Sequence, residues 1–200
     1  MPLVVGTLDI KTAFETMRHG HVSRILLNKG LHPNLVRAML REMSILFCSM
    51  VLPGMLASDS FPLEVGGKQG GVETLELFNC MVEFVLEPLV PSWRSRNFGI
   101  LFDARCPPLT HLIWADNFIL FASSVQQFQT MAQELTTALA EIEFRWKPAS
   151  MECMVCGSLI DELVQTPLIT EPGAETPLTF SLVSHLVLLG GFITARAETM

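Results

Sequence analysis

The chain has 200 residues, of which 50% are hydrophobic and 16% are charged, and its formal net charge is −7. A chain of this length can bury roughly 70% of its unfolded surface, which is enough for one compact domain. No run approaches the roughly 18 apolar residues of a membrane helix, and residues 1–6 lack the features of a secretory signal, so we expect an intracellular protein of the nucleus or cytoplasm without a membrane partner.

The first half of the chain predicts one strand followed mainly by helices. Asp9 directly follows the strand, so its carboxyl group is expected at the strand's end. Pro33 opens one helix and Gly30 closes the one before it. In chain order the expected elements are a strand at 3–8, a helix-compatible segment at 12–17, helices at 21–29 and at 34 to about 50, an irregular hairpin around 56–65, a glycine-rich turn at 66–71 and a helix at 72 to about 86.

The second half predicts strands and the clearest amphipathic helix. Ser124 and Gln127 fit a capping box at the start of that helix. Apolar strands on either side of a short acidic turn predict a β-hairpin with Asp116 at its tip. The expected elements are strands at 98–102 and 109–114, a turn at 115–117, a strand at 118–122, a helix at 125–142, paired strands at 144–147 and 151–156, a loop at 161–177 and a final apolar run at 182–194.

This order predicts an α+β fold, with an antiparallel sheet and helices packed on one face, in a single domain over residues 1–200. The cysteines are scattered apart from Cys153-x-x-Cys156, and no second pair stands at zinc-ribbon spacing, so we expect reduced thiols without a metal.

The acidic balance disfavours a nucleic-acid-binding protein, because affinity for phosphates comes largely from Lys and Arg. The charge is uneven, however. Residues 16–41 contain five Lys or Arg side chains and no acid, whereas residues 152–200 contain six acids and only Arg196. The first stretch is either a local basic face that binds a nucleic-acid backbone or the solvated side of a helix.

Five segments carry a resemblance, and they occur in one order along the chain. They are Leu8-Asp9-Ile10-Lys11-Thr12-Ala13-Phe14; Gly67-Lys68-Gln69-Gly70 with Leu77-Phe78-Asn79 and Leu86-Glu87-Pro88-Leu89; Trp114-Ala115-Asp116-Asn117; Lys147-Pro148 through Glu152 to Gly157; and Leu188-Leu189-Gly190. Together they resemble the palm motifs of reverse transcriptases, RNA-directed DNA polymerases of the non-LTR retrotransposon and group II intron type.

The resemblance implies a polymerase palm that transfers nucleotides to a primer 3′ end with Mg²⁺, or with Mn²⁺. It also implies an RNA template, a DNA primer and deoxynucleoside triphosphates as partners. By position in the motifs, Asp9 and Asp116 bind the metal and, with Asn117, form the catalytic set; Ile10, Phe14, Lys68, Gln69, Gly70 and Lys147 contact the incoming nucleotide; and Leu189 and Gly190 hold the primer.

The chain also departs from the family pattern. Asn117 stands where the family has a second Asp, and Ser150 stands where it commonly has a Lys that protonates pyrophosphate, a role in which Lys147 is the substitute. The fingers and thumb are largely absent, so we expect a truncated, partly degenerate palm whose missing segments belong to a longer polyprotein. Three alternatives remain: an active reverse transcriptase palm, an inactive palm-derived module that binds RNA or protein, and a relic without function.

Overall fold

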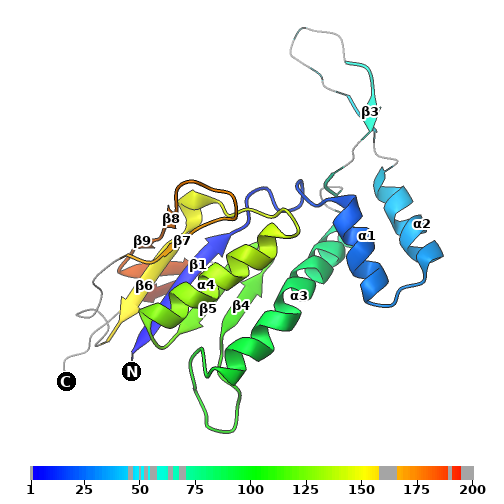
Figure 1. The fold of residues 1–200 in the computed structure, drawn as a ribbon. Coiled ribbons are helices and arrows are strands. Elements are labelled where there is room, and N and C mark those ends of the chain that lie inside the picture. Colours follow the sequence, from blue (N-terminus) through cyan, green and yellow to red (C-terminus); the bar gives the residue numbers. More distant parts are fainter. Residues whose placement is uncertain are drawn as a thin grey trace. The chain divides into compact units, whose positions relative to one another are not determined.

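The helices and strands of a computed structural model follow one another as a mixed α+β chain (Figure 1). The structure describes residues 2–44, 47–49, 51, 54, 58–62, 65–67, 71–157, 166–188 and 191–194. The elements are β1 (Leu3–Asp9), α1 (His19–Asn28), α2 (Pro33–Ser44), β2 (Phe47–Cys48), β3 (Phe61–Pro62), α3 (Val72–Ser95), β4 (His111–Trp114), β5 (Asn117–Ala122), α4 (Val125–Ala140), the 3₁₀ helix η1 (Pro148–Ser150), β6 (Glu152–Cys156), β7 (Leu168–Ile169), β8 (Leu178–Thr179), β9 (Ser181–Leu182), β10 (His185–Leu188) and β11 (Gly191–Thr194).

The chain forms two compact units. The first comprises residues 1–11 and 85–200, and the second comprises residues 12–84. The sheet and α4 belong to the first unit, whereas α1 and α2 belong to the second. None of the helices in the described ranges combines enough length with enough apolar character to span a lipid bilayer.

A five-stranded sheet in the order β4-β5-β1-β6-β9 organises the first unit. Its first three pairings are antiparallel, and the short β9 joins β6 in parallel. α4 lies across one face of this sheet (Figure 1). The predicted α+β fold with helices on one face is therefore confirmed, with one parallel edge pairing added.

Every second residue of β1, from Val4 to Leu8, lies on the face of the sheet that packs against α4. Leu8 and Val4 are fully buried, and the Gly6 position between them has no side chain. The ring of Phe128 from α4 lies against that glycine, and it also stacks edge-on with Phe180 at 5.0 Å. The absent side chain at Gly6 thus allows α4 to approach the sheet closely.

A buried apolar cluster covers one end of the opposite face of the sheet. The cluster joins the strands there to the 100–109 segment and β10; its members are Val5, Ile100, Ile119, Phe121, Met154 and Leu186. Asp9 lies four residues after Val5 in β1. Because side chains alternate between the two faces of a strand, Asp9 is on the same face as Val5. The end of this face that carries Asp9 is thereby left outside the cluster.

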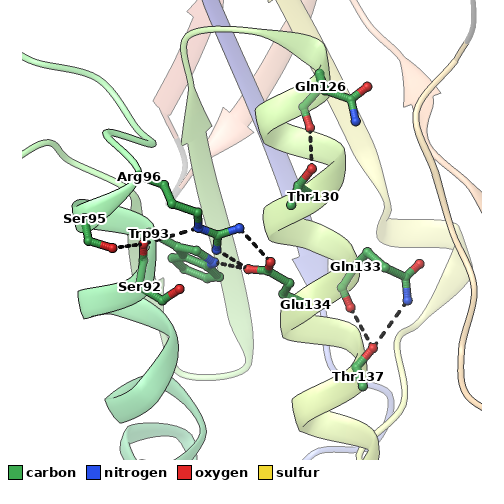
Figure 2. Close-up of polar contacts among 9 residues, drawn as sticks. All are labelled: Ser92, Trp93, Ser95, Arg96, Gln126, Thr130, Gln133, Glu134 and Thr137. Atoms are coloured by element: carbon green, nitrogen blue, oxygen red, sulfur yellow. Dashed lines mark hydrogen bonds and ion pairs between the residues drawn. The ribbon is translucent and has the colours of Figure 1, made fainter.

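A carboxylate links the end of α3 to α4 within the first unit (Figure 2). Glu134 accepts a hydrogen bond of 2.7 Å from the indole Nε1 of the buried Trp93. It also accepts two hydrogen bonds from the Arg96 guanidinium, at 2.8 and 2.6 Å. The Arg96 fork lowers the pKa of Glu134, so the carboxylate stays ionised.

In the second unit, the connection after β1 packs against the start of α3. The Phe14 ring lies 5.1 Å from that of Phe78, and the amide of Gly66 donates to the Met17 carbonyl at 2.7 Å. The His19 ring bonds the Gly66 carbonyl oxygen at 2.8 Å. These contacts fix the backbone on both sides of the α1 start.

Several element predictions were wrong in their extent. Residues 12–17 form turns rather than a helix, since Thr12 has φ of 46°. α2 ends at Ser44, before the expected 50. α3 continues to Ser95 through Pro88 and Pro91, because burial of side chains such as Trp93 outweighs the missing N–H groups.

The predicted strand pairing of 144–147 with 151–156 was also wrong. β6 pairs with β1 instead, and Trp146 makes an isolated bridge to Ile10. The Trp146 ring is buried, where its Nε1 donates to Thr136 at 2.8 Å and its face meets Phe118 edge-on at 5.5 Å. Side-chain burial therefore fixes this segment without a strand ladder. Of the strand expected at 98–102, the structure has only the bridge from Ile100 to Leu109.

Candidate functional site

The end of β1 brings three polar residues of the sequence together. Asp9 is the register partner of Asn117 at the start of β5. The amide of the next residue, Ile10, donates to the carbonyl oxygen of Asp116 at 3.0 Å. Residues separated by more than a hundred positions thus meet at one edge of the sheet.

A tight hairpin presents Asp116. Trp114 and Asn117 pair across the β4–β5 turn, so the turn proper contains only Ala115 and Asp116, and Asn117 is already in the strand. Ala115 has φ of 53°, the sign that both favoured two-residue hairpin turns require at their first central position. A positive φ in a residue other than glycine is strained and is retained only where its surroundings enforce it.

The carboxyl groups influence each other electrostatically. Burial raises the pKa of Asp9 above its ordinary value, and the nearby charge of Asp116 raises it further. The Lys147 ammonium and the Ser150 hydroxyl act in the opposite direction on the same pKa, and Glu152 adds a small increase. A carboxylate in this field gains from a nearby cation, because a positive charge stabilises the ionised form.

Asn117 completes a row on one face of the sheet with Asp9 and Trp114, which are its register partners on either side. Among the described residues, the Asn117 Oδ1 atom is buried without a hydrogen-bond partner. A buried carbonyl oxygen normally has one. At the outer end of the row, Trp114 is 65% exposed, and its neighbour on the same face, Leu112, is 51% exposed.

The segment before β6 holds the backbone of Asp9. The Lys147 amide donates to the Asp9 carbonyl at 2.9 Å. The Ser150 hydroxyl accepts from the Asp9 amide at 3.0 Å and donates to the Lys147 carbonyl at 2.8 Å. In the sequence, Ser150 is only a departure from the family pattern, because its contact with Asp9 depends on the pairing of β6 with β1.

The other predicted site residues are placed differently or lie elsewhere. Ile10 is buried beside Trp146, whereas Phe14 belongs to the second unit and packs on Phe78. The predicted nucleotide-pocket residues Lys68, Gln69 and Gly70 and the predicted primer-holding residues Leu189 and Gly190 lie outside the described residues.

The oxygen donors at this edge fit a hard divalent cation. Mg²⁺ is usually bound through one or two carboxylates together with substrate phosphates. The two Asp side chains, and the Asn117 oxygen that has no partner among the described residues, are oxygen donors of this kind. Within the described ranges, no group of three or more His, Cys, Asp or Glu side chains gathers in a way that would hold a metal. The chain therefore offers two carboxylates and an amide.

The Cys153-x-x-Cys156 pair is divided between the two faces of β6. Cys153 is opposite Gly6 and Cys156 is opposite Leu3, so their side chains point in opposite directions. Both are free thiols, and burial raises the pKa of Cys153 to about 12. A thiol with so high a pKa is a poor nucleophile and a poor metal ligand at neutral pH.

Comparison with known proteins supports the fold. No protein-family model and no curated protein matches the sequence. An apo telomerase from Candida tropicalis, truncated from the C-terminal domain, is similar in structure over 97% of this chain, with a TM-score of 0.63 and 8% sequence identity. The chain spans 34% of that telomerase chain. The chain thus has a fold like that of a telomerase, at an identity that relates the two by architecture alone.

Proposed function

We propose that this chain is a reverse-transcriptase-type palm, whose edge formed by Asp9, Asp116 and Asn117 serves nucleotidyl transfer to a primer 3′ end. The observation that carries the proposal is the meeting of the two acids at the end of β1, where burial and then the charge of Asp116 raise the pKa of Asp9. The similarity of fold to a telomerase supports the same reading.

Asp9 and Asp116 would hold the cation, with Asn117 Oδ1 as a neutral third donor. Mg²⁺, when bound, would activate the primer hydroxyl and stabilise the charge of the leaving pyrophosphate. Ser150 keeps the Asp9 backbone in place through its hydrogen bond with the amide. Because Asn117 adds no negative charge, the site would bind divalent cations more weakly than three carboxylates would.

Primer extension on an RNA template, in Mg²⁺ and separately in Mn²⁺, tests the proposal. We expect Asp9→Ala and Asp116→Ala to abolish extension and Asn117→Asp to increase it. Asp103→Ala serves as a matched control, because Asp103 pairs with Arg105 in an exposed turn away from the site. Absence of extension by the unaltered chain, or equal extension by all variants, would contradict the catalytic role.

A second candidate is a palm that has lost catalysis and kept binding. The neutral Asn117 in the row with Asp9 favours it, because a two-metal site depends on concentrated negative charge. Titration with Mn²⁺ followed by electron paramagnetic resonance separates the two candidates. Binding that is lost in Asp9→Ala supports the catalytic palm, and no binding in either protein supports the second candidate.

A further inference from the structure

The acid-free stretch of the chain becomes two helices of the second unit. Residues 16–41 include all of α1 and most of α2. The five Lys or Arg side chains of this stretch have exposed positions in a chain whose net charge is −7. The positive charge of this stretch is therefore at the surface, because none of the five cations belongs to the buried core.

Two cations in α1 and at its C-cap contact α3. Lys29 forms an ion pair of 2.9 Å with Glu83. The Arg24 guanidinium lies 5.9 Å from the centre of the Phe84 ring, within the range of a cation–π contact. These two cations therefore contribute to packing within the second unit.

The cations of α2 lie on a different kind of surface. Asn34, Arg37 and Arg41 recur every three or four residues and so share one side of the helix. Val36 and Met43, on the opposite side, are buried. An open hollow of about 350 Å³ is lined by Asn34, Arg37, Ala38, Arg41 and Glu42.

We propose that this surface, here called the α2 arginine face (Asn34, Arg37, Ala38 and Arg41), binds the phosphate backbone of single-stranded nucleic acid. Four residues of helix separate the two Arg Cα atoms by about 6 Å along the axis, so both guanidiniums can reach one strand. A guanidinium fork binds phosphate with two hydrogen bonds, and the small Ala38 between them leaves room for the sugar-phosphate chain.

The composition of the hollow favours nucleic acid over a protein. The described residues that line it are polar or charged apart from Ala38, whereas the cores of protein interfaces are rich in aromatic and Met side chains. Asn34 accepts a hydrogen bond from Arg37 through Oδ1 at 3.3 Å, which leaves its amide nitrogen as the end that donates to a phosphate. Glu42 at the rim repels phosphate and weakens the binding.

Fluorescence anisotropy with a short labelled single-stranded RNA tests the proposal across a series of salt concentrations. For Arg37→Ala/Arg41→Ala we expect roughly tenfold weaker binding and a log–log salt slope shallower by about 1.4, which corresponds to two phosphate contacts on a single strand. Glu42→Gln should bind more tightly. Arg37→Lys/Arg41→Lys should retain the salt slope, because it keeps both charges.

The matched control is Arg94→Ala/Arg105→Ala, which removes the same charge from exposed positions of the first unit. An equal loss of binding in this control would overturn the proposal, as would equal displacement of the RNA by poly-glutamate, which would indicate an acidic protein ligand. Circular dichroism verifies that each variant is folded. The binding assay contains EDTA and no nucleotides, so failure of the proposed nucleotidyl transfer and failure of the α2 arginine face are measured separately.

Discussion

Replacing Gly6 with alanine tests how β1 packs against α4. A Cβ atom at this position would overlap the Phe128 ring carbons Cζ and Cε2 and would lie 3.3 Å from the Glu152 carbonyl oxygen. Phe128 is fully buried and stacks on Phe180, so it cannot move aside without disturbing the core. Overpacking of this kind costs about 1–3 kcal/mol, and we expect Gly6→Ala to lower the free energy of unfolding by about 2 kcal/mol.

Urea unfolding followed by far-UV circular dichroism measures the effect as a shift of the midpoint. Gly20→Ala is the matched control, because a Cβ atom there meets nothing within 4 Å and lies on a helix, where alanine gains up to about 1 kcal/mol over glycine. Phe128→Ala alone should cost about 3–5 kcal/mol. In the double variant the penalty at Gly6 should vanish, and simple additivity of the two costs would refute the close contact.

Two further predictions concern the first unit. Glu134→Gln should destabilise it by about 1 kcal/mol, through weaker bonding of the buried Trp93 indole and loss of the partly exposed ion pair with Arg96. The pKa of Glu134 is lowered from 4.5, so its contribution to the free energy of unfolding is complete above that value and is lost as the pH falls through the folded pKa; pH-dependent unfolding should be flatter in the variant over this acidic window. In a thiol-reagent assay on the native protein, the exposed Cys106 should react quickly and Cys153, whose pKa is about 12, should react only on unfolding; simultaneous reaction would contradict the buried placement.

Some elements could be predicted from a few neighbouring residues in the sequence. α4 begins where the capping box placed it, with Ser124 Oγ accepting from the Gln127 amide at 3.2 Å. The apolar run before Asp9 is β1, and the hairpin carries Asp116 in its turn. In each case a capping residue, the spacing of apolar residues or a turn determines the element, and these signals lie within a few residues of one another.

The wrong predictions share a dependence on distant residues. β6 was expected beside 144–147, its neighbour in sequence, but it pairs with β1, more than a hundred residues away. α3 was expected to end near Leu86, and it continues because Trp93, seven positions later, is buried. The contact between Ser150 and Asp9 follows from the β1–β6 pairing, so a sequence reading without that pairing could not assign it.

The neutral side chain of Asn117 limits the negative charge at the end of β1, where Asp9 and Asp116 meet. Its Oδ1 atom, which has no partner in the described part of the chain, lies in the row with Asp9, whose pKa is already raised by burial and by Asp116. A carboxylate at residue 117 would therefore add repulsion and lose solvation, so without divalent cations Asn117→Asp should be less stable by about 1–3 kcal/mol. With Mg²⁺ at a hundred times its dissociation constant, binding to the folded state should restore about 2.7 kcal/mol. The same destabilisation with EDTA and with Mg²⁺ would mean that this edge does not bind a cation. Asn117 would then only relieve the repulsion between Asp9 and Asp116.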